Sequence, residues 1–229
     1  MASVIQFTTV NYPESDGKPM GESDVHIAEI IRLRELLKRF YAGQTVYVSA
    51  NLLVFYEQGK PKKFVVPDVF VVQGVQPGDR KSYKIWIEGK PPDAIIEVTS
   101  RKTKKKDLVD KPGLYHRLRV AEYFLFDPTQ EYLDPSLQGH RLIGDRYEPI
   151  AADAEGALVS RQLGLRLCAE GGHLMLYRLD TGERLLTDAE ALRAEAEARQ
   201  AEAKAREAAE AEVARLREQL RRRGTGGTP

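Results

Sequence analysis

The sequence has almost no cysteine. Cys168 is the single cysteine among 229 residues. One cysteine cannot form an internal disulfide, and it leaves no cysteine pairs for a structural zinc site. A chain with this composition fits a reducing compartment, so we expect a cytoplasmic protein in which Cys168 is a small core residue.

Long apolar runs and nucleotide-binding loops are also missing. No segment approaches the roughly 20 apolar residues of a membrane span, and no basic region followed by an apolar stretch marks a signal peptide. Neither a Walker loop nor a GxGxxG loop is present, which argues against P-loop nucleotide hydrolysis and dinucleotide chemistry. The formal net charge is only +1, so total charge does not identify a partner. We expect no membrane partner.

The composition is that of a folded domain, with 42% hydrophobic and 30% charged residues. We predict four regions: an irregular arm over 1–22, a domain over 23–187, a charged, alanine-rich helix over 188–223 and a disordered tail over 224–229. The heptad pattern in the long helix is weak, so a coiled coil is possible but poorly encoded.

Hydrophobic periodicity predicts the elements of the domain. A helix begins near Ser23 or Asp24, which are good N-cap residues, and stops near Gly43. The order of helices and strands favours an α/β fold with a mixed sheet. The other predicted elements are strands at Thr45–Tyr56, Lys63–Val72, Asp93–Thr99 and Ala121–Asp127, a helix at Pro112–Leu118, and added β-hairpins from Ile150 to Leu179.

Two carboxylates stand inside strongly apolar strands. Asp68 follows Pro67 within one strand, and Glu97 ends the apolar run that starts at Ala94. An unpartnered buried carboxylate is costly, so the fold must satisfy both, and a shared divalent cation would do so. The alternatives are that Asp68 caps a bend made by Pro67 and that Glu97 pairs with a lysine.

Cations follow Glu97 closely. Arg101, Lys102, Lys104, Lys105 and Lys106 give five cations in six residues. Such a run is usually a solvated loop, but beside a divalent-cation site Lys102 and Lys104 would contact phosphate groups. Either lysine could also act as the cation of the site.

The combined pattern resembles a known family. Asp68, then Glu97 to Ser100, then Asp107 and Lys111, then Tyr115, then Glu122 to Pro128 are similar to the Uma2 family. That family belongs to the PD-(D/E)xK nuclease superfamily, which has the restriction-endonuclease-like fold. The resemblance runs from about Ser23 to Asp188.

The resemblance implies a four-stranded mixed core sheet flanked by helices, with Asp68 and Glu97 as ligands of Mg²⁺ or Mn²⁺. The superfamily pattern places a lysine two residues after the glutamate, where this chain has Thr99. Lys111 matches a displaced lysine. Because proline disfavours the α conformation in the residue before it, Pro112 predicts a helix that starts at Lys111 or Pro112 and leaves the direction of Lys111 open.

The roles of several other residues allow more than one interpretation. Asp107 either orients Lys111 or caps the helix. Glu29 could add an acidic group to the metal site from the first helix, where His26 is expected to be a surface residue. We expect Tyr115 and Trp86 to be packing residues.

The function predicted is that of a Mg²⁺-dependent endonuclease that hydrolyses nucleic acid, with DNA as the expected substrate. The alternative is a degenerate nuclease fold that binds nucleic acid or protein without cutting, which the missing in-strand lysine supports. Helix 188–223 could mediate assembly, and we expect a homo-oligomer such as a dimer.

Overall fold

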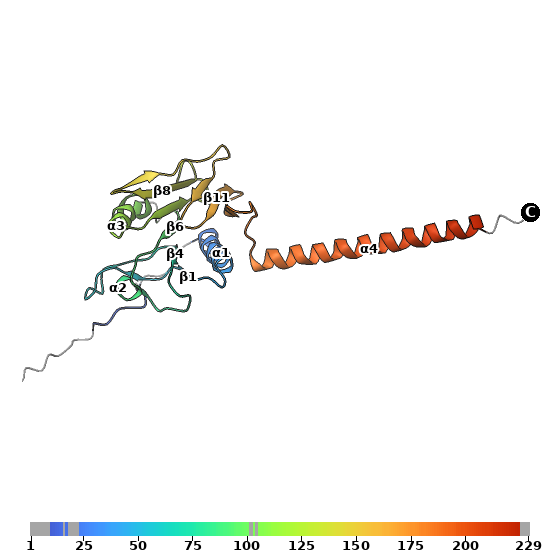
Figure 1. The fold of residues 1–229 in the computed structure, drawn as a ribbon. Coiled ribbons are helices and arrows are strands. Elements are labelled where there is room, and N and C mark those ends of the chain that lie inside the picture. The colour runs from blue at the N-terminus through green and yellow to red at the C-terminus, as the bar shows by residue number, and fades with distance from the viewer. Residues whose placement is uncertain (1–9, 16, 18–22, 101–102, 104, 225–229) are drawn as a thin grey trace, which may run out of the picture. The chain divides into compact units, whose positions relative to one another are not determined.

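The computed structural model describes residues 10–15, 17, 23–100, 103 and 105–224. The chain divides into two compact units, residues 1–185 and 186–229. The first unit contains all the named strands and the first three α-helices (Figure 1), and the second consists mainly of α4 (Asp188–Gly224).

Helix α1 (Asp24–Phe40) begins and ends where the sequence predicts. The side chain of Ser23 caps it by accepting a hydrogen bond from the backbone N–H of His26, and Gly43 adopts a positive φ of 79° just beyond its end. The apolar stripe of the helix includes Leu33 and Leu37, which are fully buried.

The central sheet has six strands in the order β1-β4-β6-β7-β8-β9. Strands β6 and β7 are parallel and the other neighbours are antiparallel, which makes the sheet mixed, as predicted. The sheet has two strands more than the four-stranded core that the family resemblance implies, because the hairpin of β8 and β9 extends it. The strand bounds are β1 Val46–Ala50, β4 Val69–Gln73, β6 Ala94–Val98, β7 Glu122–Phe126, β8 Leu137–Ile143 and β9 Arg146–Pro149.

The first two predicted strands are each broken. Thr45–Tyr56 divides into β1 and β2 (Val54–Phe55), with Asn51 between them at a φ of 48°. Lys63–Val72 divides into β3 (Phe64–Val65) and β4 around Pro67, which cannot donate a ladder hydrogen bond. Strand β5 (Tyr83–Lys84) joins β2 and β3 in a small three-stranded sheet, followed by the short helix α2 (Ile85–Glu88).

Apolar side chains pack on both faces of the central sheet. Ile96 and Val98 of β6 join the core beneath α1, whereas Ile95 joins the core beneath α3 (Lys111–Arg117). Figure 1 shows α1 and α3 on opposite sides of β6. This is the burial on two faces that an uninterrupted apolar strand predicts.

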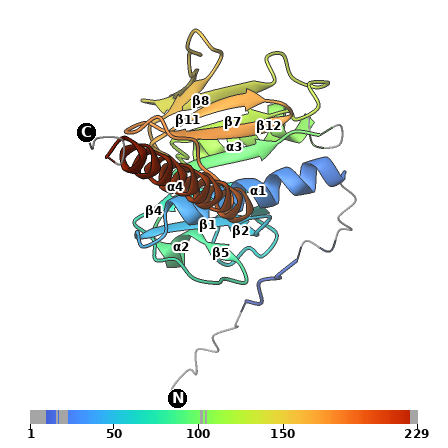
Figure 2. The same cartoon turned by 90° about the vertical axis from the view of Figure 1, so that its right-hand side faces the viewer.

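The predicted added hairpins form a third sheet with the order β10-β11-β12. Its strands are Leu158–Ser160, Leu165–Glu170 and His173–Arg178, and their leucines share the core under α1. Figure 2 shows β11 and β12 beside β7 and β8.

Helix α4 starts with reciprocal capping. Thr187 N donates to Glu190 Oε2 at 2.8 Å, and Glu190 N donates to Thr187 Oγ1 at 3.3 Å. This arrangement is a capping box, and it explains the predicted start. Within the described part of the chain, no helix is both long enough and apolar enough to cross a membrane. The predicted tail beyond residue 224 lies outside the described residues.

Candidate active site

The structure brings Asp68 and Glu97 together at neighbouring strands. Asp68 immediately precedes β4, which pairs with β6 through Val69 and Ile96. Asp68 N donates to Glu97 Oε2 at 3.2 Å, and Val98 N donates to Asp68 Oδ2 at 2.8 Å. Both carboxylates are buried. Because Val69 pairs with Ile96 in antiparallel register, Asp68 stands opposite Glu97 at the end of β6.

The side chain of Lys111 points toward this pair. The sequence left this direction open because of Pro112. Its Nζ lies 2.7 Å from Glu97 Oε2 and 2.9 Å from Asp107 Oδ1. The Lys111 side chain is 14% exposed, whereas those of Glu97 and Asp107 are fully buried. Lys111 is thus more exposed than either of the two carboxylates that it contacts.

A π-helical turn sets the position of Lys111. This turn (Lys106–Asp110) runs directly into α3 at Lys111, so the helical path begins earlier than the proline alone predicts. Pro112 has no N–H to donate. It follows a turn in which the α-helical hydrogen-bond pattern is already interrupted, so its missing donor breaks no regular helix. Asp107 lies within this turn, where it contacts Lys111.

Tyr115 does more than pack. Its hydroxyl donates a hydrogen bond to Glu97 Oε1, and the residue is completely buried. Asp107, Lys111 and Tyr115 are spaced four residues apart, which places them along one side of a helix. That spacing was visible in the sequence and indicated that the three side chains share one face. Trp86, in contrast, packs against Tyr12.

The prediction of a surface position for His26 is wrong, because this residue is only 1% exposed. Its Nε2 hydrogen-bonds to the carbonyl oxygen of Val98 and lies 3.6 Å from Asp68 Oδ2. Since a carbonyl only accepts, Nε2 carries the hydrogen. His26 is in helical phase with the buried Ile30 and Leu33, and that phase was the signal for its burial.

The remaining predicted residues lie elsewhere or outside the described residues. Glu29 accepts hydrogen bonds from Arg32 and from Leu174 N, and it lies 2.8 Å from His173 Nδ1. These contacts tie α1 to β12, and in the described part of the chain Glu29 contacts neither Asp68 nor Glu97. Lys102 and Lys104 lie outside the described residues.

The cluster carries an excess of negative charge. Burial raises the pKa of Glu97 to about 8; the Lys111 charge opposes this rise, and the carboxylates of Asp68 and Asp107 add to it. Burial favours neutral Lys111, but the carboxylates of Glu97, Asp68 and Asp107 outweigh it and raise the pKa of the lysine. Three carboxyl groups therefore surround one persistent cation, and the pKa of Glu97 lies above its usual range.

Oxygen donors in this cluster fit a hard divalent cation. Asp68 Oδ1 and the buried Asp107 Oδ2 have no hydrogen-bond partner among the described residues. Mg²⁺ is commonly held by one or two carboxylates and retains several waters. No group of three His, Cys, Asp or Glu side chains in the described ranges is arranged to hold a metal ion.

The fold and site together define an α/β protein with a buried Asp–Glu–Lys cluster at the ends of neighbouring sheet strands. The model of the Uma2 family, described as "Putative restriction endonuclease", matches residues 15–170. The chain belongs to the Uma2 family, which confirms the resemblance. The match spans the central sheet and every residue of the cluster.

Comparison with solved structures finds a similar chain described as a "putative nuclease belonging to DUF820" from Anabaena variabilis. The two chains share 13% sequence identity with a TM-score of 0.47, over 67% of this chain and 86% of the other. A search of curated proteins finds no match.

Proposed function

We propose that this protein is a metal-dependent endonuclease that hydrolyses phosphodiester bonds of nucleic acid, with DNA as its substrate. The observation that carries the proposal is the buried Asp68–Glu97 pair with the Lys111 ammonium 2.7 Å from Glu97. Family membership supports a nuclease, and the excess negative charge of the cluster supports a divalent cation.

Asp68, Glu97 and the Val98 carbonyl would hold Mg²⁺ or Mn²⁺. When bound, the ion would activate a water molecule and neutralise charge on the phosphate. Lys111 would donate a hydrogen bond to the attacking water or to a phosphate oxygen, where negative charge develops. Asp107 positions Lys111. Tyr115 positions Glu97, and His26 positions the Val98 carbonyl.

A second candidate is a nucleic-acid or protein-binding module without catalysis. Thr99, at the position of the usual in-strand lysine, is buried and cannot supply a cation. Lys111 supplies a cation from the start of α3 instead, and this favours the endonuclease over the binding module. The two candidates differ in whether loss of Glu97 abolishes a chemical step or leaves function intact.

The test is cleavage of supercoiled plasmid and of single- and double-stranded oligonucleotides with Mg²⁺, Mn²⁺ or EDTA. Wild type is compared with Glu97→Gln, and Glu131→Gln provides the same chemical change at an exposed position. We expect metal-dependent cutting by wild type and Glu131→Gln and a loss of at least about 100-fold in Glu97→Gln, because a lost metal ligand removes transition-state stabilisation.

Binding of Mn²⁺ measured by calorimetry gives a readout that is independent of activity. Wild type should bind the ion more tightly than Glu97→Gln. Cutting that survives in Glu97→Gln, or no cutting of any substrate by wild type, would contradict the proposal and favour the binding module.

A further inference from the structure

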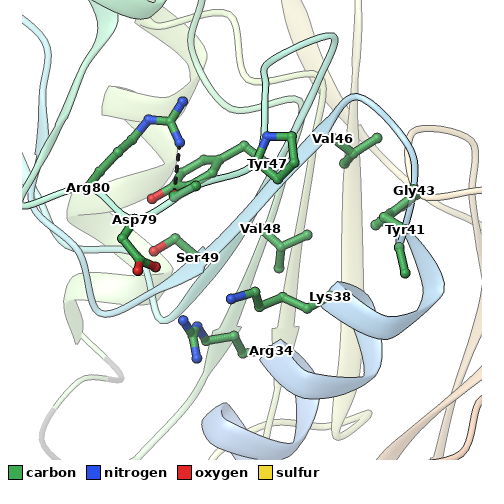
Figure 3. Close-up of a pocket in the computed structure, with 13 residues that line it drawn as sticks. Arg34, Lys38, Tyr41, Gly43, Val46, Tyr47, Val48, Ser49, Asp79 and Arg80 are labelled. Carbon is green, nitrogen blue, oxygen red and sulfur yellow. Dashed lines mark hydrogen bonds between the residues drawn. The ribbon is translucent and has the colours of Figure 1, made fainter.

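A cavity of about 420 Å³ lies along the open edge of the central sheet. Strand β1 is the edge strand, and the cavity is bounded by β1, the C-terminal half of α1 and the segment 77–80 (Figure 3). Val48 and Ser49 line it from β1, so the cavity follows the strand that leads toward the Asp68 site.

Positively charged side chains line this cavity on two sides. Arg34 and Lys38 project from successive turns of α1, and Arg80 lies across the cavity from them (Figure 3). Like charges four residues apart on a helix destabilise it by a few tenths of a kcal/mol. Neither Arg34 nor Lys38 has an ion-pair partner among the described residues.

Arg80 is held in place by its own contacts. Its Nε lies 2.7 Å from Glu88 Oε1, and its guanidinium carbon lies 3.9 Å from the ring centroid of Tyr47. The lining also includes one acid, Asp79, which is exposed. The excess of positive charge suits an anionic ligand, and the unpaired Arg34 and Lys38 are the groups available to bind it.

The backbone that lines the cavity leads toward the candidate active site along β1 and along α1. Two residues beyond Ser49 along the chain, Asn51 N donates to the backbone oxygen of Asp68 at 3.1 Å. Two residues of extended chain span about 7 Å. On α1, Arg34 and Lys38 follow His26 by eight and twelve residues, or roughly 12 and 18 Å along the helix axis.

We infer that this cavity binds backbone phosphates of the nucleic-acid strand a few nucleotides away from the cleavage site. The inference rests on the proposed function and adds to it the path of the substrate. A B-form strand advances about 3.4 Å per nucleotide, so Arg34 and Lys38 face phosphates roughly three to six nucleotides from the metal site.

The test removes the two unpaired cations together, in the double variant Arg34→Gln/Lys38→Gln of the full chain. Glutamine retains a good helix propensity. The control, Arg193→Gln/Lys204→Gln, removes the same charge from exposed positions on α4. Binding of labelled duplex and single-stranded oligonucleotides is measured by fluorescence anisotropy in EDTA over about 50 to 200 mM salt, the range in which phosphate contacts dominate the salt dependence.

The double variant should bind duplex at least about tenfold more weakly than the control, and its slope of log affinity against log salt should be smaller by about two. Each lost phosphate contact removes about 0.9 from this slope for duplex DNA. An unchanged slope, or an equal loss in the control, would overturn the inference. Calorimetric binding of inorganic phosphate that is lost in the double variant, together with equal duplex affinity in the double variant and the control, would assign the cavity to free phosphate and would also overturn the inference.

The outcome is separable from that of the proposed function. Weakened binding in the double variant, with no cutting by wild type, would support the phosphate path and refute the nuclease. Normal duplex affinity in the double variant, with cutting that depends on Glu97, would refute the path and leave the nuclease standing.

Discussion

Raising the pH from about 5 to 8 should destabilise the metal-free protein through Glu97. This carboxyl group is fully buried, and burial is the largest cause that raises its pKa from 4.5 to about 8. Between these values the folded state keeps a proton that the unfolded state has lost. Stability therefore falls as pH rises through this interval and levels off above the folded pKa.

The expected slope for one such group is about 1.4 kcal/mol per pH unit, which amounts to a few kcal/mol over the whole interval. Lys111 does not alter this slope. Its pKa is raised in the folded state, so its contribution is fully present below the unfolded lysine value and constant over this range.

Urea unfolding in EDTA at several pH values measures the effect, with Glu97→Gln as the reference. Glutamine has nearly the same shape and does not titrate, so the difference between the two proteins isolates Glu97 from other titrating groups. The stability of wild type relative to Glu97→Gln should decline with pH. Parallel pH profiles for the two proteins would refute the buried, protonated state.

The same proton should couple to metal binding under the proposed function. A bound ion requires the ionised carboxylate, so affinity for Mn²⁺ should rise about tenfold per pH unit up to pH 8. Calorimetry in buffers of different ionisation enthalpy should detect close to one proton released per ion at pH 6.5. Equal affinity at pH 6 and 8 would contradict the coupling.

Three further predictions concern the fold and assembly. Lys111→Gln leaves the buried carboxylates without their cation, so the free energy of unfolding should fall by about 3 kcal/mol. Urea unfolding at neutral pH measures this loss. Unchanged stability would show that Lys111 is not the counter-ion of these carboxylates. In Gly139→Ala the new Cβ would lie 2.8 Å from Phe124 and 2.9 Å from Leu158. The free energy of unfolding should fall by about 1–3 kcal/mol, and the melting temperature should fall with it. In the control Gly113→Ala the new Cβ meets nothing within 4 Å, so this variant should not be destabilised. Deleting residues 188–229 should convert a proposed dimer into a monomer in light scattering, and an unchanged association state would exclude the helix as the assembly device.

Much of the architecture could be predicted from the local pattern of the chain. The start of α1 followed from the Ser23 cap, and its buried face followed from the helical period of its leucines. The two-sided burial of β6 followed from its unbroken apolar run. These features depend on residues near each other in sequence, so the sequence alone was sufficient.

Strand breaks and sheet size were harder to predict. The break at Asn51 depends on hydrogen bonds to the backbone oxygens of Pro67 and Asp68, which are distant in sequence. The hairpin of β8 and β9 extends the sheet because β8 pairs with β7. Propensity does not determine such long-range pairing, so it could not be read from either segment alone.

The groups available for chemistry could be identified from the local sequence, namely two carboxylates in apolar strands and a lysine at the position expected from the family. Their arrangement depends on packing between distant segments. Packing of the π-turn and α3 against β6 turned Lys111 and Tyr115 toward Glu97, and packing of α1 placed His26 at Val98. The direction of a side chain depends on the helix path and on the surface that the helix covers, and both are set by contacts between segments far apart in the chain.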